Sequence, residues 1–346
     1  MRRLGWLSAV VGGTVLLASC GGTSSSNADV GKGNLTGAGS TFVEPFYNRA
    51  FYEYTQEHNQ VTINYQAIGS GGGIQQITKN TVDFGATDVP MDVSEVAAAG
   101  GTDSLVQLPT TLGVISLAYN LPGVQRLNLD GATISGIYLG QIKRWNDPAL
   151  QSLNSNRLPA LDIKVAHRSD GSGTSYAFTD YLAKESPDWK SKVGVGKSVN
   201  WPLGVGGKGN EGVGSLVKQS EGTIGYVELA EVIQAKLQQA YIKNRAGSFL
   251  QATLEGASQA AAANPSISPE NFSITDQSGA GAYPLATFSW VVLRQEQKDA
   301  AREKALVELW RWMVTTGQSY GTDLQYAPLP KSAADYALDQ LQKVKT

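Results

Sequence analysis

The sequence predicts an α/β fold with more than one domain, and three observations support this. Short apolar segments typical of strands alternate with helical patterns along the whole chain. The chain has 346 residues, more than one hydrophobic core usually contains, so we expect two domains. Hydrophobic residues make up 41% and charged residues 17% of it, which excludes a disordered protein and a coiled coil.

The N-terminal segment predicts export. Arg2 and Arg3 precede an apolar run over 4–18, which is the pattern of a secretory signal and is too short for a membrane span. Leu17-Ala-Ser-Cys20 resembles a bacterial lipobox, in which the cysteine receives a diacylglyceryl lipid; an ordinary signal peptide with an incidental cysteine is the alternative. We therefore expect a signal peptide over 1–19 and a flexible tether over 20–29 that is lipidated at Cys20.

The apolar pattern predicts the following elements along the chain. The clearest helix covers 299–316, where Leu306, Leu309, Trp310 and Met313 fall at helical spacing, and Gly317 is expected to end it. The segment 260–263, followed by two prolines, predicts a loop or a short helix. No apolar run after the signal is long enough to cross a bilayer. The expected strands are 61–65, 113–119, 163–166 and 288–293.

Three loops rich in Gly, Ser and Thr each follow a strand-like run and precede a helical pattern. They are Thr36–Phe42, Ile68–Gly73 and His167–Ser175. Glycine lets the backbone approach a ligand closely, and free amides with the helix dipole favour an anion at a helix start. Ordinary N-caps are the alternative for each loop taken singly. The three together indicate an anion site.

Two charged residues sharpen this interpretation. Arg168 can form a bidentate pair with an oxyanion; a salt bridge with Asp170 is the alternative, and both can hold together. Asp88 would repel an anion unless the anion brings a proton to donate. Phosphate keeps a proton near neutral pH and sulfate does not, so Asp88 favours phosphate, with a turn or cap role as the alternative.

At these residues the chain resembles the phosphate-binding proteins of bacterial phosphate ABC importers. The resemblance runs from Leu35 to about Leu329 and includes the three loops. It implies a two-domain periplasmic-binding-protein (type II) fold whose hinge the chain crosses twice, with domain one at 30–115 plus 286–346 and domain two at 116–285. The further matching segments are 81–88, 137–145, 201–210 and 222–228.

The resemblance also implies residue roles. Asp88 would accept the phosphate proton, Arg168 would bind the oxyanion with Asp170 as its orienting partner, and other positions would donate hydrogen bonds. Alanine is common in the family at Ser40, and a second serine is common at Gly71; whether Ser40 adds a contact stays open. The implied phosphate-binding residues are Thr41, Phe42, Ser70, Asp88, Arg168, Ser172, Gly173 and Thr174.

The resemblance implies a function as well. We expect the protein to bind inorganic phosphate by hinge closure and to deliver it to the permease and ATPase subunits of an ABC importer. It would act as a monomer without a cofactor or metal, anchored by lipid on the extracytoplasmic side of a membrane.

Other functions fit the sequence less well. The serine-hydrolase pattern fails at Ser70 and Ser172, and His58 and His167 are the two histidines, so neither a catalytic triad nor a zinc site is expected and we predict no enzyme activity. A net charge of −2, or −4 without the signal arginines, argues against nucleic-acid binding and requires local recognition of an anion. Two alternatives stay open: binding of another tetrahedral oxyanion, such as phosphonate or sulfate, and phosphate sensing without transport.

Overall fold

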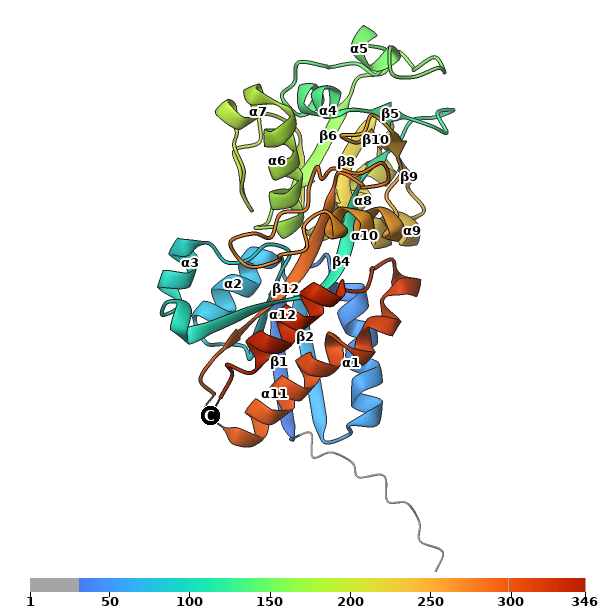
Figure 1. The fold of residues 1–346 in the computed structure, drawn as a ribbon. Coiled ribbons are helices and arrows are strands. Elements are labelled where there is room, and N and C mark those ends of the chain that lie inside the picture. Colours follow the sequence, from blue (N-terminus) through green and yellow to red (C-terminus); the bar gives the residue numbers. More distant parts are fainter. Residues whose placement is uncertain (1–30, 298, 346) are drawn as a thin grey trace, which may run out of the picture.

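The computed structural model describes residues 31–297 and 299–345, which form an α/β fold of two stacked lobes (Figure 1). The α/β prediction is confirmed. The predicted signal peptide (1–19), Cys20 and the tether (20–29) lie outside the described residues. Within the described part of the chain, no helix combines the length and apolar character that a membrane crossing requires.

The first lobe, in the lower half of Figure 1, contains both ends of the described chain. Parallel strands β1 and β2 pair, β1 also pairs with β3, and β3 pairs antiparallel with β12. Helices α1 and α11 lie on one side of these strands, and α2 and α3 lie on the other. The elements are β1 (Gly33–Gly39), α1 (Glu44–Glu57), β2 (Val61–Ala67), α2 (Ser70–Thr78), β3 (Phe84–Thr87), α3 (Val93–Ala98), β12 (Ala286–Arg294), α11 (Ala300–Met313) and α12 (Lys331–Leu341), with short 3-10 turns at Thr102–Ser104, Thr316–Tyr320 and Thr322–Leu324.

The second lobe is built around β6, which pairs in parallel with β7 and β8. A separate small sheet has the order β11-β10-β5. The elements are β5 (Asn128–Leu129), α4 (Gly131–Tyr138), α5 (Pro148–Gln151), β6 (Lys164–Arg168), α6 (Gly173–Glu185), α7 (Pro187–Lys192), β7 (Val205–Gly207), α8 (Gly209–Gln219), β8 (Thr223–Glu228), α9 (Leu229–Ala235), β9 (Gln238–Gln239), β10 (Tyr241–Lys243), β11 (Phe249–Leu250) and α10 (Leu254–Ala262).

One long buried strand, β4 (Leu105–Tyr119), joins the lobes. Up to Val114 it pairs antiparallel with β12, and from Ile115 onward it pairs with β8. The main sheet therefore continues through both lobes in the order β2-β1-β3-β12-β4-β8-β6-β7. The chain enters the second lobe through β4 and returns to the first through β12.

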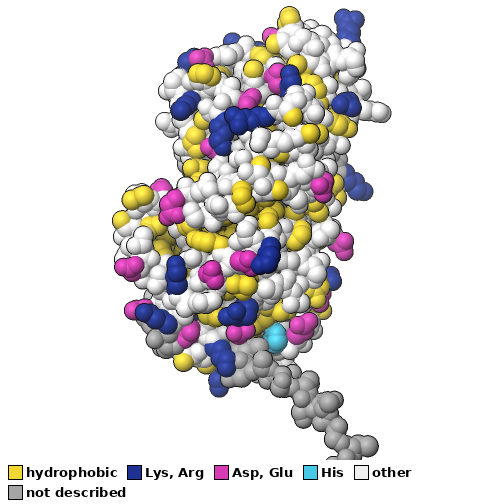
Figure 2. Space-filling view, in the orientation of Figure 1, with side chains coloured by type: hydrophobic (Ala, Val, Ile, Leu, Met, Phe, Trp, Pro, Cys, Tyr) yellow, Lys and Arg dark blue, Asp and Glu magenta, His cyan; other side chains and the backbone are white. Residues whose placement is uncertain are grey.

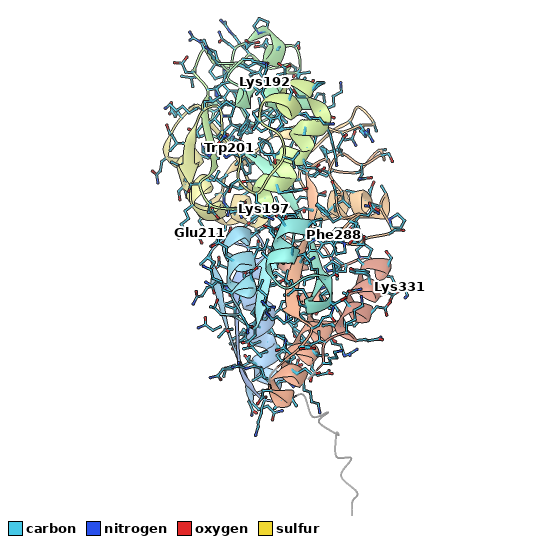
Figure 3. The ribbon with its side chains drawn as sticks, turned by 90° about the vertical axis from the view of Figure 1, so that its left-hand side faces the viewer. Lys192, Lys197, Trp201, Glu211, Phe288 and Lys331 are labelled. Carbon is cyan, nitrogen blue, oxygen red and sulfur yellow. The ribbon has the colours of Figure 1, made fainter. Side chains whose placement is uncertain are left out.

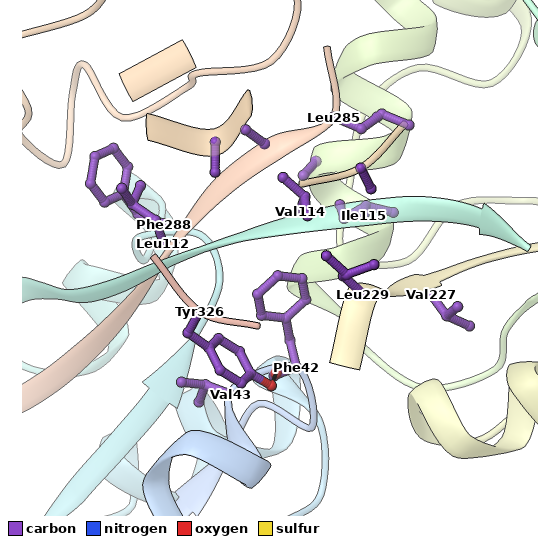
Figure 4. Close-up of a cluster of buried hydrophobic side chains, with 14 of the residues drawn as sticks. Phe42, Val43, Leu112, Val114, Ile115, Val227, Leu229, Leu285, Phe288 and Tyr326 are labelled. Atoms are coloured by element: carbon purple, nitrogen blue, oxygen red, sulfur yellow. Dashed lines mark hydrogen bonds between the residues drawn. The ribbon is translucent and has the colours of Figure 1, made fainter. Parts of the chain in front are cut away.

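A hydrophobic cluster packs around this crossing (Figure 4). The ring of Phe42 lies against Gly113 of β4, where an added Cβ would come within 2.4 Å of the ring. The hydroxyl of Tyr326 donates a 2.6 Å hydrogen bond to the Phe42 carbonyl, and both side chains are buried. These contacts hold the loop after β1 directly beneath the point where β4 changes partners.

The other predicted strands match the structure to within two residues at each end, and three details differ. Strand β4 begins at Leu105, whereas the sequence predicted a start at Gly113. Its first half was not predicted because it contains Pro109 and neighbouring polar residues, which interrupt the apolar pattern. Helix α11 ends at Met313, and Gly317 lies in the following 3-10 turn and does not end the helix. The segment 260–263 is largely the last turn of helix α10.

Candidate functional site

The predicted site residues gather where the two lobes meet. In the first lobe, Thr41 and Phe42 follow β1, Ser70 begins α2 and Asp88 follows β3. Because the carboxyl ends of parallel strands lie at one edge of a sheet, β1 and β3 bring these segments together. In the second lobe, Arg168 ends β6, and 172–174 form the start of α6.

Asp88 is the buried acid of the site, with 2% of its surface exposed. The hydroxyls of Ser40 and Ser289 donate to its Oδ1 at 2.6 and 2.9 Å, and the Ser70 hydroxyl donates to Oδ2 at 3.3 Å. Burial raises the pKa of Asp88 to about 6, although these hydroxyls and the charge of Arg168 lower it. The carboxylate is therefore mostly ionised at neutral pH and can accept a hydrogen bond.

Arg168 is the buried cation, with 3% of its surface exposed. Its Nε and Nη2 donate to the two carboxylate oxygens of Asp170 at 2.8 and 2.5 Å, and Nη1 donates to the Thr174 hydroxyl at 3.4 Å. Burial raises the pKa of Asp170, but the hydrogen bond and charge of Arg168 and the Gly209 amide outweigh it and hold that pKa below its usual value. The guanidinium is thus fixed in place while one N–H on each terminal nitrogen remains for a ligand.

The start of helix α6 supplies further donors. Ser172 caps the helix, its hydroxyl oxygen accepting from the Ser175 amide at 3.1 Å, while its own O–H stays free to donate. The Gly173 and Thr174 amides lie in the first turn and have no intrahelical acceptor. A Cβ added at Gly173 would lie 2.6 Å from the Cβ of Asp88. Only glycine lets the helix start approach the acid this closely.

Direct contacts join the lobes beside these groups. The Gly71 amide donates to the Gly171 carbonyl at 2.8 Å, and the Asn210 side chain donates to the Thr41 hydroxyl at 3.1 Å. Gly71 is part of α2, because that helix begins at Ser70, earlier than the glycine-rich sequence predicts. The helix starts of α2 and α6 therefore face each other across the junction.

A pocket of about 260 Å³ opens beside the site and shares Thr41 and Asp170 with it. Acidic and basic side chains both line it, and burial together with the nearby charge of Glu211 raises the pKa of Glu44. Figure 3 shows Glu211 and Lys197 at the level of the junction. The lining residues are Thr41, Glu44, Ala67, Ile68, Asp170, Lys208, Gly209, Asn210 and Glu211.

The surface carries no dominant charge on the face drawn in Figure 2, where acidic and basic side chains are interspersed and hydrophobic ones gather near the junction of the lobes. This distribution agrees with the net charge of −2. A long-range field of this face would not attract an anion, so an anion would have to be recognised by local amides, hydroxyls and Arg168.

Several residues that the sequence analysis did not assign take part in the site. Ser289 is a buried serine in the mostly apolar strand β12, which also contains the buried Thr287. Ser40 does add a contact, because its hydroxyl bonds Asp88 and accepts from the Phe42 amide at 3.0 Å. Tyr226 accepts from the backbone amide of Arg168 at 3.0 Å.

Glu228, at the end of β8, is a second buried acid near the site, with 4% of its surface exposed. Its Oε2 has no hydrogen-bond partner among the described residues. Burial raises its pKa well above the usual value, although the charge of Arg168 lowers it. Burial therefore favours the protonated form of Glu228 far more than in a solvent-exposed glutamate.

Both histidines pack against aromatic rings, and His167 also contacts the Arg168 carbonyl through its ring Nδ1 at 3.0 Å. The ring of His58 contacts Tyr54 at 4.4 Å between centroids, and the ring of His167 stacks on Trp201 at 4.9 Å. Within residues 31–297 and 299–345, no three metal-ligating side chains gather in one place.

Comparisons with known proteins agree with the fold and identify the family. The family model of the PBP superfamily domain matches residues 23–316. A phosphate-binding protein PstS of Xylella fastidiosa is 42% identical over 304 residues, covering 86% of this chain and 81% of that protein. A protein of the same name from Methanocaldococcus jannaschii is 33% identical over 331 residues, covering 89% of this chain and 85% of its own.

Solved structures share the fold. A high-affinity periplasmic phosphate-binding protein (PfluDING), bound with phosphate, superposes with a TM-score of 0.70 at 18% identity, covering 88% of this chain and 92% of that one. A phosphate ABC transporter substrate-binding protein from Clostridium perfringens, also with bound phosphate, gives a TM-score of 0.63 at 19% identity, covering 86% of this chain and 100% of that one.

Proposed function

Since this chain belongs to the PBP superfamily, in the family of the PstS phosphate-binding proteins, we propose that the site between its lobes holds a phosphate ion. The protein binds inorganic phosphate for an ABC importer. The observation that carries the proposed site is the contact of buried Asp88 with the start of α6 beside Arg168.

The donors and the acceptor have distinct tasks in this site. Arg168, the amides of Gly173 and Thr174 and the hydroxyl of Ser172 would donate to the phosphate oxygens, and the Ser70 hydroxyl would join them by turning away from Asp88 Oδ2. Thr41 would add donors from the first lobe, and the Phe42 amide would do so by leaving the Ser40 hydroxyl.

Asp88 would accept the proton that phosphate carries at neutral pH. Sulfate brings no such proton, so it would face a buried, unpaired carboxylate. That mismatch costs roughly 2–5 kcal/mol. Binding of sulfate or another unprotonated oxyanion is therefore not favoured. The similarity to PstS proteins favours transport over a sensor that feeds no transporter.

The change of partners within β4 suggests where the lobes would move. We place the hinge at the step from Val114 to Ile115 and at the return into β12, with domain one at 30–115 plus 286–346 and domain two at 116–285. A phosphate that contacts donors in both domains binds the closed arrangement more tightly than the open one. Binding would therefore close the hinge.

The predicted lipobox supports a further part of the proposal. The protein would be exported and held on the extracytoplasmic side of a membrane by a diacylglyceryl lipid on Cys20, acting as a monomer beside its importer. Expression of the full chain as wild type and as Cys20→Ala tests this anchor. The wild type should sediment with membranes and the variant should be released; a variant that still sediments would refute the lipid anchor.

The site also argues for binding without catalysis. Neither histidine is in hydrogen-bond contact with a serine of the site, so no activated nucleophile is formed. Phosphate should leave the protein chemically unchanged. Turnover of a phosphate ester by the purified protein would contradict this.

Calorimetric titration tests the function directly. The wild type should bind phosphate and show no comparable affinity for sulfate at pH 7. Asp88→Asn should narrow the gap between phosphate and sulfate by at least tenfold. Asp162→Asn, an exposed acid of the second lobe, is the matched control and should leave both affinities unchanged. Equal affinity of the wild type for phosphate and sulfate would overturn the proposal.

A further inference from the structure

Two serine hydroxyls hold one oxygen of Asp88. Ser40, from the loop after β1, and Ser289, from β12, both donate to Oδ1 at 2.6 and 2.9 Å. The Oδ2 atom receives one longer bond of 3.3 Å, from Ser70. An ionised carboxylate has acceptor capacity for about two hydrogen bonds on each oxygen. Oδ1 is thus filled by protein donors, while Oδ2 keeps room for a donor from a ligand.

Neither serine is a solvated surface residue that contacts Asp88 by chance. Ser289 is 0% exposed and Ser40 is 1% exposed, so water cannot replace the carboxylate as their acceptor. Ser289 also lies where the pairing of β12 with β4 shifts register, between Ser289 and Trp290. Such irregularities redirect side chains and are frequent beside functional sites. The bulge thus lies beside Ser289, which contacts Asp88 although the two residues are 201 positions apart in the chain.

The other groups around Asp88 leave these two donors with a decisive influence on whether Asp88 is ionised. Arg168 of the second lobe favours the ionised carboxylate, whereas burial opposes it. Glu228, at the end of β8, also lies close enough to interact with Asp88, and burial raises its pKa well above the usual value. Tyrosines from α1, β2 and the segment before α12 complete the surroundings and stay neutral, their pKa raised by burial: Tyr47, Tyr65 and Tyr326.

We propose that Ser40 and Ser289 are positioning residues that keep Asp88 ionised and turned with Oδ2 toward the ligand, and that they thereby set the lowest pH at which phosphate is bound tightly. This inference rests on the proposed phosphate site. Hydroxyl donors stabilise the charged carboxylate and not its neutral form, so losing one lets Asp88 take up a proton at higher pH. A neutral Asp88 cannot accept the phosphate proton, but it can donate to sulfate.

The test is the phosphate affinity of Ser40→Ala, measured by calorimetry against the wild type from pH 5.5 to 8.5. If one lost donor raises the pKa of Asp88 by about one unit, the variant should bind phosphate ~5-fold more weakly than the wild type at pH 6. At pH 8.5, where Asp88 is ionised in both proteins, the affinities should be equal, or the variant tighter because the Phe42 amide is released. Comparing both proteins at each pH cancels the titration of phosphate itself.

Two further variants sharpen the test. Ser289→Ala should also lose phosphate affinity in a pH-dependent way. Its loss should be smaller than that of Ser40→Ala, because the bond from Ser289 to Oδ1 is longer. Ser116→Ala is the matched control, a buried serine of the same main sheet whose hydroxyl donates to Gln239, and it should leave the pH profile unchanged. For sulfate, Ser40→Ala should bind ~5-fold more tightly than the wild type at pH 7.

The outcomes separate this inference from the proposed function. A loss that is the same at every pH would mean that Ser40 acts on packing alone, and it would overturn the inference while leaving phosphate binding intact. No change at any pH would overturn it too. Failure of the wild type to bind phosphate would instead overturn the proposed function. Thermal unfolding of each variant at pH 8.5 verifies that the compared proteins are folded.

Discussion

The first lobe builds its half of the site from four separate segments of the chain, whereas the second lobe builds its half mainly from the single segment 168–174. The first half supplies the acid and the hydroxyls that surround it. The second half supplies the cation, its partner Asp170 and the amides of a helix start. The two halves therefore differ in chemistry as well as in construction.

This difference separates attraction from selection. The second half can attract any tetrahedral oxyanion, because Arg168 and the start of α6 respond to negative charge. In the proposed site the first half adds Asp88, which would penalise every anion that lacks a proton. Substitutions in the second half should therefore weaken the binding of all anions alike. The effect of substitutions around Asp88 should depend on pH and on whether the ligand carries a proton.

The largest effect is expected from Arg168→Gln, which removes the attraction. Asp170 would lose its buried partner, and phosphate affinity should fall by roughly 30- to several-thousand-fold, about 2–5 kcal/mol. Calorimetry should show that sulfate binding does not improve. Arg144→Gln, an arginine of the same lobe with 56% of its side chain exposed, is the control and should bind like the wild type. Near-normal phosphate affinity in Arg168→Gln would contradict the division of the site into an attracting half and a selecting half.

The next effect concerns folding stability and Asp88. Its pKa is raised to about 6 in the folded protein, so the stability it contributes is complete below about pH 4 and is lost as the pH rises through 6. Relative to Asp88→Asn, the ligand-free wild type should lose about 2–3 kcal/mol of unfolding free energy between pH 4 and pH 7. Urea unfolding at several pH values measures this loss. A difference in unfolding free energy between the two proteins that stays constant with pH would contradict a raised pKa of Asp88 in the first half.

A smaller effect is expected where the halves touch. The methyl of Gly173→Ala would lie 2.6 Å from the Cβ of Asp88 and should force the lobes apart. Such overpacking costs about 1–3 kcal/mol, so phosphate and sulfate should both bind roughly 5- to 150-fold more weakly. Gly136→Ala, in helix α4, is the control, because its methyl would meet only the flexible end of Ile142 at 3.0 Å. Unchanged affinity in Gly173→Ala would show that the halves need not approach.

The smallest effect is expected from the ion pair between Lys197 and Glu95, which bridges the lobes with side chains 15% and 22% exposed. Lys197→Met should weaken phosphate binding by no more than about fivefold, and less at high salt. Lys192→Met breaks an exposed pair with Asp188 inside the second lobe and should have no effect on binding. A loss far above fivefold, or one that ignores salt, would mean that Lys197 also contacts the anion.

The same contrast explains what the sequence could predict. The second half of the site could be predicted from a short stretch of sequence, because its cation, the partner of that cation, the helix cap and the helix start all lie within 168–174. The first half depends on strand pairing between distant segments, and no local pattern places Ser289 beside Asp88. The full length of β4 was hidden for a related reason: Pro109 disfavours a strand locally, and a bulge in the pairing with β12 accommodates it.

The bonds between the lobes have a consequence for how affinity is set. The Gly71 amide with the Gly171 carbonyl, and Asn210 with Thr41, join the lobes through protein atoms alone. They raise the fraction of molecules that are binding-competent before an anion arrives, and the apparent dissociation constant is the intrinsic one divided by that fraction. Weakening them would raise the apparent dissociation constant of every anion by one common factor and leave the ranking of anions untouched. Sensitivity to phosphate concentration can therefore be tuned independently of selectivity.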